Sequence, residues 1–309
     1  MRLRVFTEPQ QGATYDELLA VAGAAERLGF DAFFRSDHYQ RIGGGDPGPG
    51  PSDAWLTLAA IGRETKRIRL GTLVTPVTFR YPGALALGVA QADAMSGGRV
   101  ELGLGAGWYD VEHAAYGIPF PATGDRFAML EEQLEILTGM WATPRGERYS
   151  FTGRQFRIAD SPALPKPVQQ PRPPIILGGW GTRRTPRLVA RYADEFNVPF
   201  APVAAYRAAC DHVRRACEAS GRDPESMRFT VAQTVCIGTN EADYRRRAQE
   251  SAQDPDAARA TVIAGTPAEA VARVHEYGEA GAETVYLQYL TLDDHEHLEL
   301  IAAEVLPHV

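Results

Sequence analysis

Asp37 and His38, two consecutive residues, are the strongest candidates for proton chemistry in this sequence. They follow an apolar segment at 31–36 that is typical of a buried strand. Histidine titrates near neutral pH, so His38 could give or take a proton during a redox step. A histidine at a strand end can also be satisfied by a loop carbonyl, so the residue types alone leave a structural role open.

A glycine-rich turn, GGWGT at 178–182, is the best candidate for binding a phosphate. Glycines allow backbone N–H groups to approach an anion closely, and the N-terminus of a following helix adds a favourable dipole. The hydroxyl of Thr182 and the charges of Arg183 and Arg184 would assist. The pattern is neither GxGxxG nor a P-loop, which argues against a Rossmann or nucleoside triphosphate site. A tight turn without a ligand is the alternative.

A second glycine-containing turn lies at 105–109. Gly105 and Gly107 could let a planar ring approach the backbone, and Trp108 could stack on that ring or on a substrate. The alternative is a plain turn anchored by core aromatic residues.

Metal and disulfide chemistry are both disfavoured. His295 and His297 have the spacing of a metal-binding pair, but they alternate with glutamates on an expected surface helix, and no further ligands lie nearby in the sequence. We therefore expect no metal site. The cysteines are too few for a disulfide framework and are expected to be inert thiols in the cytosol.

Composition excludes several classes of protein. The chain has 309 residues and a formal net charge of -7, which is a poor footprint for binding nucleic acid. It contains no run of about 18 apolar residues, so no transmembrane helix is expected. The N-terminus is charged and strand-like and lacks the apolar core of a signal peptide, so we expect a cytoplasmic protein that acts on a small molecule.

Short apolar runs alternate with amphipathic stretches along the whole chain. The expected strands lie at 2–7, 31–36, 68–74, 99–105, 174–179, 194–199, 227–238 and 283–290. The expected helices lie at 15–28, 53–64, 82–95, 126–141, 185–193, 203–220, 241–251, 267–280 and 295–306. Eight such alternations predict an α/β fold, a (β/α)8 TIM-like barrel. The segment 142–173 interrupts the alternation of strands and helices. It is interpreted as an insertion, with a small hairpin, inside one domain that spans 1–309.

In such a barrel the active site lies at the carboxyl ends of the strands. That rim carries polar, aromatic and glycine residues and few charges. Besides the two turns it includes Val74, Thr75, Gln233 and Gln288. It suits a large planar ligand that carries a phosphate.

The sequence resembles the luciferase-like monooxygenase superfamily of flavin and deazaflavin enzymes, and within it the actinobacterial branch that depends on coenzyme F420. The resemblance covers essentially the whole chain. The segments that carry it are RVFTEPQQGATYDELL (4–19), FDAFFRSDHY (30–39), RIRLGTLVTPVTFRYPG (67–83), MSGGRVELGLGAGWYDVEHAAYGIPFP (95–121) and IILGGWGTRRTPRLVARYADEFN (175–197). It implies a TIM-like barrel with an insertion, assembled as a homodimer.

The resemblance also assigns residues to a cofactor. It places Asp37 and His38 at the deazaflavin ring. It implies a non-proline cis peptide or a bulge behind the ring, at Leu73-Val74 or Val74-Thr75. The turn after the fifth strand would hold the phosphate through Gly178, Gly179, Gly181 and Thr182, with Trp180 and Arg183 beside it.

Two positions depart from the pattern of the family. Sugar-phosphate dehydrogenases of the superfamily carry a glutamate acid after the fourth-strand glycines, where this chain has Trp108. Trp180 stands where many relatives have another glycine. The more aromatic site favours an uncharged or aromatic substrate.

The resulting hypothesis is a reductase that transfers a hydride from the reduced deazaflavin to a small acceptor such as an imine or enone. His38 would transfer the proton, and Asp37 would orient His38 or bind the ring. The residues expected to shape the substrate side are Trp55, Trp108, Gln233 and Gln288. The first alternative is a monooxygenase that uses FMN and O2, and the second is a binding protein without activity.

Overall fold

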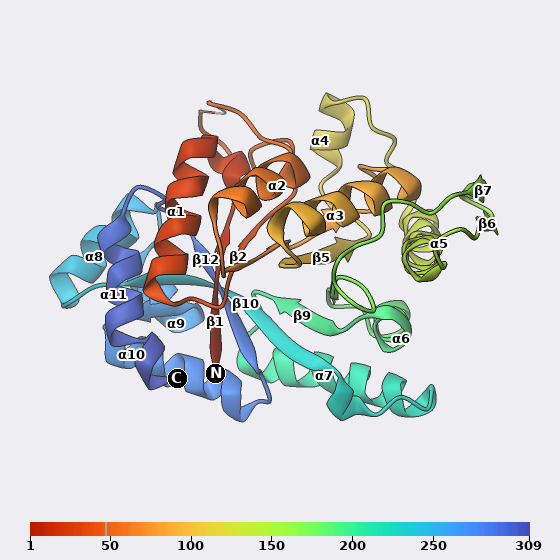
Figure 1. Cartoon of the computed structure of the whole chain (residues 1–309). Coiled ribbons are helices and arrows are strands. Elements are labelled where there is room, and N and C mark those ends of the chain that lie inside the picture. Colours follow the sequence, from red (N-terminus) through yellow and green to blue (C-terminus); the bar gives the residue numbers. More distant parts are fainter. Residues whose placement is uncertain (47) are drawn as a thin grey trace.

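Parallel strands form a closed barrel at the centre of the molecule (Figure 1). The computed structural model describes residues 1–46 and 48–309. Within them, eight strands pair in a ring, and the pairing of β10 with β9 closes it. In ring order these are β1 (Arg2–Thr7), β2 (Ala32–Arg35), β3 (Arg69–Thr72), β5 (Val100–Gly105), β8 (Ile175–Gly178), β9 (Glu195–Pro199), β10 (Arg228–Ile237) and β12 (Thr284–Tyr289). The predicted TIM-like barrel is therefore confirmed.

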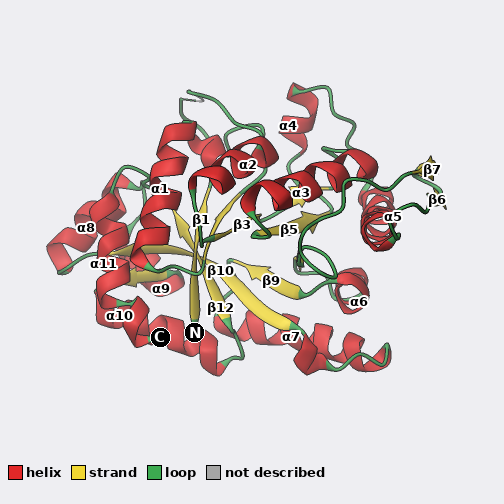
Figure 2. Cartoon of the chain, viewed as in Figure 1, coloured by secondary structure: helices red, strands yellow, loops and turns green. Residues whose placement is uncertain are grey.

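Helices surround this barrel, as Figure 2 shows. They are α1 (Tyr15–Leu28), α2 (Ala54–Glu64), α3 (Pro82–Ser96), α5 (Thr123–Ala142), α6 (Arg184–Tyr192), α7 (Val203–Ala219), α8 (Glu241–Glu250), α10 (Pro267–Glu279) and α11 (His295–Glu304). Their ends follow the local sequence signals. Thr14 and Glu17 form a capping box at the start of α1, and Gly29, at φ 90°, ends it.

Several short elements were not predicted from the sequence. They are α4 (Asp110–Ala115), α9 (Pro255–Thr261), β4 (Thr75–Pro76), β11 (Ile263–Gly265) and the single-turn helices Pro9–Gln11, Pro224–Ser226 and Leu306–His308. Each is too short to show a hydrophobic period. The expected strand at 68–74 is divided into β3 and β4, and β4 pairs with β5 beyond the division.

The insertion projects from one side of the barrel, beyond α5 (Figure 1). Its strands β6 (Tyr149–Thr152) and β7 (Arg157–Ser161) form the expected antiparallel hairpin. Glu132 of α5 accepts hydrogen bonds from the backbone N–H groups of Arg154, Gln155 and Phe156. This carboxylate ties the hairpin turn to the helix.

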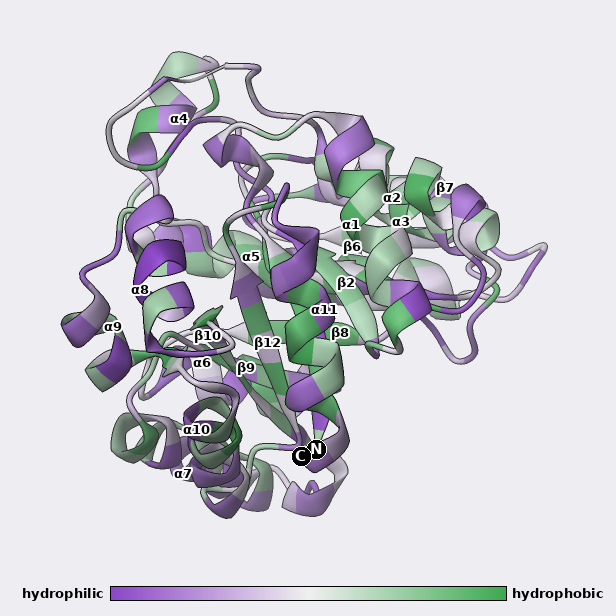
Figure 3. Cartoon of the chain, turned by 90° about the vertical axis from the view of Figure 1, so that its left-hand side faces the viewer, coloured by the Kyte–Doolittle hydropathy of each residue, from purple (hydrophilic) through white to green (hydrophobic). Residues whose placement is uncertain are grey.

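Apolar side chains of the strands and the helices form the core between them, and α8 consists mostly of hydrophilic residues (Figure 3). The barrel interior is different at its two ends. Arg4, fully buried near the amino end, pairs with Glu101 at 2.9 Å and with Asp31. The opposite end is hollow. Within the described residues, none of the helices has the length and apolar character needed to cross a membrane.

Candidate active site

A cavity of about 630 Å³ opens at the carboxyl ends of the strands. Its size and mostly apolar lining are typical of a site for a cofactor and a small substrate. The polar side chains that line it belong to Glu8, Ser36, His38, Thr123, Thr185 and Asn197. Its apolar side includes Leu73, Val74, Pro76, Leu104, Ala106, Trp108, Phe127, Leu130, Leu177, Trp180 and Leu188. The position of this cavity in the barrel is the one predicted for the active site.

His38 faces the cavity and is held by Glu112, a residue of α4. The Nδ1 atom of His38 lies 2.8 Å from Oε1 of Glu112, and the second carboxylate oxygen accepts the backbone N–H of Tyr39 at 2.8 Å. A carboxylate can only accept a hydrogen bond. Nδ1 of the neutral imidazole therefore carries the ring proton and donates a hydrogen bond to Glu112. Nε2 is therefore the ring nitrogen that can exchange a proton in the cavity.

Asp37 lies outside the cavity lining and does not orient His38. Consecutive residues of extended backbone project to opposite sides, so only one of the two can face the site. The Asp37 carboxylate is fully buried and accepts from Thr75 at 2.8 Å and from Arg80 at 2.5 Å. Arg80 also pairs with Asp53, which caps α2. The two residues are therefore not paired with each other: His38 pairs with Glu112, and Asp37 pairs with Arg80.

Glu8, the first residue after β1, supplies a second proton-carrying group to the cavity. Burial raises the pKa of its carboxyl, and this effect exceeds the opposing influence of His38 and of a hydrogen bond with Gln288. A carboxyl group of this kind retains its proton to higher pH than an exposed one. Glu8 and His38 follow neighbouring strands, and His38 lies close enough to lower the pKa of the Glu8 carboxyl in part.

One side of the cavity is shaped by the break between β3 and β4. The Leu73-Val74 peptide bond is cis, as the resemblance implied. Glycines of β5 accommodate this break, because a Cβ on Gly103 would lie 2.0 Å from the Thr72 carbonyl oxygen and one on Gly105 would lie 2.9 Å from Val74. The backbone of β5 therefore comes into direct contact with Val74 beside the cavity.

The glycine turn after β8 forms another side of the same cavity. Gly178, Gly179, Trp180 and Gly181 all line it. Gly179 has φ 132°, a value that only glycine adopts readily, and a Cβ on Gly181 would lie 2.6 Å from Oγ1 of Thr185. The turn leads into α6, whose N-terminal N–H groups favour an anion.

Several other predicted site residues do not line the cavity. Thr182 and Arg183 are exposed beyond the turn, and Thr185 takes the place expected of Thr182. Thr75 is fully buried and donates to Asp37. Trp55 is buried behind it and donates from its indole N–H to Thr75 at 3.2 Å. Thr75 and Trp55 therefore support the site from behind, and none of these four residues lines the cavity.

The two glutamines also have structural partners. Gln233 faces away from the barrel interior, since its neighbour Ala232 lines the cavity, and its amide donates to Ala201 and to Tyr277, each at 2.7 Å. Gln288 accepts from Thr234 at 2.5 Å and hydrogen bonds with Glu8. Neither lines the cavity, so substrate contact by these glutamines has no support in the structure.

Glu8, Arg80 and Glu112 are the functional candidates that sequence reasoning missed. Glu8 directly follows a predicted strand and so lies on the expected rim, but nothing in its local sequence marked it as a proton carrier. Glu112 sits on a six-residue helix and meets His38 across 74 positions of sequence, so no local signal identified it. Within the described residues, no group of three His, Cys, Asp or Glu side chains is placed to hold a metal ion.

The arrangement suits proton transfer beside a planar ring. His38 and Glu8 can exchange protons, the aliphatic side chains of Leu73 and Val74 exclude water, and the glycine turn can bind a phosphate. This combination fits a redox cofactor that carries a ring at one end and a phosphate at the other.

Comparison with known proteins agrees with this geometry. Residues 1–254 match the family described as luciferase-like monooxygenase. A protein of Microbacterium testaceum, named F420-dependent glucose-6-phosphate dehydrogenase, is 36% identical over 185 residues, which cover 59% of this chain and 52% of that protein. A protein of the same name from Intrasporangium calvum is 29% identical over 322 residues, which cover 94% of each chain.

The solved structures extend the likeness to the whole barrel. An F420-dependent secondary alcohol dehydrogenase, in complex with an F420-acetone adduct, superimposes with a TM-score of 0.85 at 19% identity and covers 100% of this chain and 98% of its own. At this identity the likeness shows the fold alone, and the Microbacterium testaceum match spans about half the length of that relative. The family match, however, covers far more than half of this chain and includes every residue that lines the cavity, so the chain belongs to the luciferase-like monooxygenase family.

Proposed function

We propose that this protein is an oxidoreductase dependent on coenzyme F420, and that it transfers a hydride between the reduced cofactor and a small uncharged acceptor. The observation that carries the proposal is one cavity that combines a proton-carrying histidine, an apolar wall and a glycine phosphate turn. The names of the F420-dependent relatives support the choice of cofactor.

The residues present fit such a cofactor. The glycine turn from Gly178 to Gly181 would hold the phosphate through backbone N–H groups, in space that a Cβ on Gly181 would fill. Leu73, Val74 and Gly105 would lie against the ring. The reduced deazaflavin supplies a hydride when it is bound.

His38 then completes the reaction on the substrate side. The acceptor gains a hydride at carbon and needs a proton at its nitrogen or oxygen, or at the second carbon of an enone. In its imidazolium form His38 would give that proton from Nε2, which leaves the neutral ring with its remaining proton on Nδ1, hydrogen-bonded to Glu112. Glu8 can return the proton, since burial raises the pKa of its carboxyl.

The lining of the cavity favours an uncharged acceptor such as an imine or enone. Among its described residues there is neither lysine nor arginine, so a sugar phosphate would find no cation beyond the turn that serves the cofactor. Trp108, 62% exposed, lies at the position where sugar-phosphate dehydrogenases are expected to carry a glutamate. An aromatic side chain there can stack on a planar or apolar substrate.

The test is a comparison of two cofactors in binding and turnover. F420 is expected to raise the melting temperature of the protein more than FMN does at equal concentration, because a ligand that binds only the folded state stabilises it. Reduced F420 is then mixed with a panel of imines and enones, and the visible absorbance of the oxidised cofactor is followed. Preference for FMN together with oxygen uptake would establish the monooxygenase alternative.

The role of His38 is tested in the same assay. His38→Gln is expected to bind F420 within about threefold of the parent and to lower the turnover rate by roughly 10²- to 10⁴-fold, the usual contribution of a general acid. His275→Gln, at an exposed histidine, is the matched control and is expected to keep the parent rate. Full turnover by the His38 variant would remove this histidine from the mechanism.

We also propose that the barrel and its insertion at 142–173 form one domain and that two copies of the chain form a homodimer. Exposed apolar side chains on α2 and α3 support the dimer. The cytoplasmic location expected from the sequence stays a prediction.

A further inference from the structure

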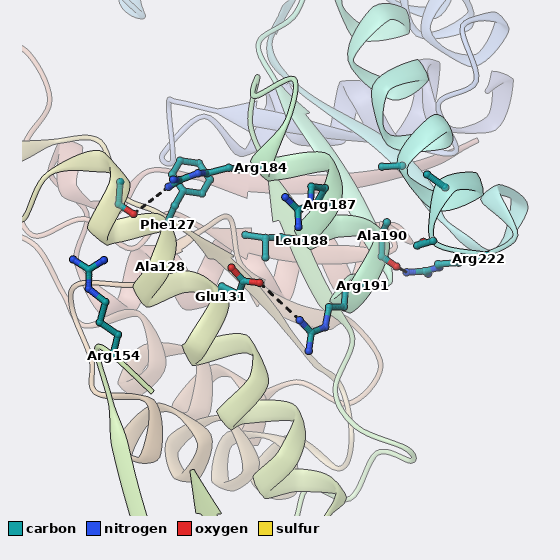
Figure 4. Close-up of a pocket in the computed structure, with 15 residues that line it drawn as sticks. Phe127, Ala128, Glu131, Arg154, Arg184, Arg187, Leu188, Ala190, Arg191 and Arg222 are labelled. Atoms are coloured by element: carbon teal, nitrogen blue, oxygen red, sulfur yellow. Dashed lines mark hydrogen bonds and ion pairs between the residues drawn. The ribbon is translucent and has the colours of Figure 1, made fainter. Parts of the chain in front are cut away.

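A second cavity, of about 890 Å³, lies between α5, α6 and the end of α7 (Figure 4). Its lining is strongly basic. Of the described residues around it, five are arginines and one, Glu131, is acidic. The arginines are Arg154, Arg184, Arg187, Arg191 and Arg222. This gathering of positive charge stands out in a chain whose formal net charge is -7.

Some of these arginines are already occupied by the fold. Arg222 donates to the carbonyls of Ala190 and Ala193 at the end of α6, and Arg154 pairs with Asp125 at 3.0 Å. The positive charge of Arg222 still contributes to the potential in the cavity, because backbone carbonyls leave a guanidinium charge uncompensated, whereas Asp125 offsets the charge of Arg154.

The remaining three arginines form a row on α6. Arg184 donates to the Gly124 carbonyl at 3.1 Å, and Arg191 lies 3.5 to 3.8 Å from carboxylates of α5. Arg187, between them, is exposed and has no hydrogen bond or ion pair with any residue that the structure describes. Its five donors are therefore available to a ligand.

This basic cavity lies next to the active-site cavity. Phe127 and Leu188 line both of them, and at the helix ends Thr123 and Thr185 face one cavity while their neighbours Gly124 and Arg184 face the other. A chain that leaves the glycine turn along α6 would therefore pass from the phosphate site directly to Arg184 and Arg187.

We propose that this arginine-lined cavity binds an extended chain of carboxylates, the oligoglutamate tail that follows the phosphate in coenzyme F420. The inference rests on the proposed function for the identity of the cofactor. The guanidinium groups on α6 are about one helical turn apart, and such a row can pair with carboxylates spaced along a flexible chain. Each arginine can bind one carboxylate through two parallel hydrogen bonds. The cavity thereby favours cofactor with a long tail over forms without one.

The experiment measures cofactor binding by fluorescence titration and does not depend on turnover. The probes are F420 with several glutamates and the form that ends at the phosphate and its lactate, without glutamates. Arg187→Glu is expected to weaken binding of the long-tailed form roughly tenfold and to reduce its salt dependence, since an opposite charge replaces a partner. Binding of the form without glutamates is expected to change by less than about twofold.

Arg63→Glu is the control, since Arg63 is an exposed arginine of α2, a helix that does not line the cavity. It makes the same change of net charge and should leave both titrations unaltered. Equal effects of Arg187→Glu on the two forms of the cofactor, or no effect on either, would overturn the proposal. The melting temperature of each variant is measured to verify that the variant is folded.

Failure of the proposed arginine site can be distinguished from failure of the proposed function. If neither form of F420 binds to the parent protein, the proposed function fails, and a labelled γ-linked oligoglutamate peptide then tests the cavity directly. Binding of the peptide that Arg187→Glu weakens and Arg63→Glu does not would support the polycarboxylate site. No binding of the peptide in that case would exclude it.

Discussion

The buried ion pair between Asp37 and Arg80 fixes the end of β2 from behind the active site. Burial alone would lower the pKa of the Arg80 guanidinium, but the Asp37 carboxylate beside it raises that pKa above its usual value. Asp37 is fully buried and Arg80 is 15% exposed. A charge in such a place is stable only with its partner, because water cannot replace it.

Removing Arg80 should therefore be costly. Arg80→Met is expected to lower the free energy of unfolding by about 3–5 kcal/mol, the usual loss when one partner of a buried pair is removed. Urea denaturation measures this value. The double variant with Asp37→Asn should recover part of the loss, since it also removes the unpaired charge. Arg207→Met, at an exposed arginine of α7, is the control. A loss below about 1 kcal/mol would mean that water solvates Asp37 after all.

At the scale of elements, α11 is fastened to the barrel by a buried histidine. Nε2 of His297 accepts the backbone N–H of Ile237, the last residue of β10, at 3.0 Å, and its ring stacks on Tyr289. Because this nitrogen accepts a hydrogen bond, it carries no proton. Burial, assisted by the nearby charge of Arg247, lowers the pKa of His297 to about 3.

This contact makes stability depend on pH. In the unfolded chain a histidine binds a proton near pH 6.5, whereas the folded protein resists protonation of His297 until about pH 3. Between these values the unfolded state binds more protons, so stability falls as the pH falls. The expected loss from pH 7 to pH 5 is about 2 kcal/mol.

Urea denaturation at several pH values tests this expectation. His297→Gln keeps an acceptor for the Ile237 N–H and should flatten the pH dependence. His295→Gln, at an exposed histidine of the same helix, should leave it unchanged. The assignment fails if the slope of the parent protein persists in the His297 variant.

At the scale of the whole molecule, α2 and α3 expose three large apolar side chains at or near their surface. These helices lie side by side (Figure 1). Leu56 on α2 is 75% exposed, and Tyr81 and Leu87 at and near the start of α3 are 80% and 46% exposed. Exposed large apolar side chains on these two neighbouring helices are the feature on which we base the interface of the proposed homodimer.

This surface is where the proposed homodimer is expected to form. Changing Leu56 and Tyr81 to glutamate together should convert the dimer to a monomer, because two charges would be buried on each side of the interface. Light scattering during gel filtration measures the mass. Val111→Glu, which alters an exposed apolar residue on α4, should stay dimeric. A variant that remains dimeric would place the interface elsewhere.

The sequence by itself determined the order of the elements, the barrel and the two glycine turns. These features are local: hydrophobic periods set strands and helices, and glycines mark the positions where Gly103, Gly105 and Gly181 leave no room for a Cβ. His38 was also identifiable, since it is a histidine at a strand end. The short α4 and the division of β3 from β4 were not, because neither has a period to detect.

Only the tertiary structure decided which groups meet at the site. His38 pairs with Glu112 and not with Asp37, because consecutive residues face opposite sides and the partner comes from a different loop. For the same reason Gln233 turns away from the cavity although it lies on the expected strand. Pattern and spacing place a residue on an element, but the direction of its side chain and its distant partners follow from how the elements pack.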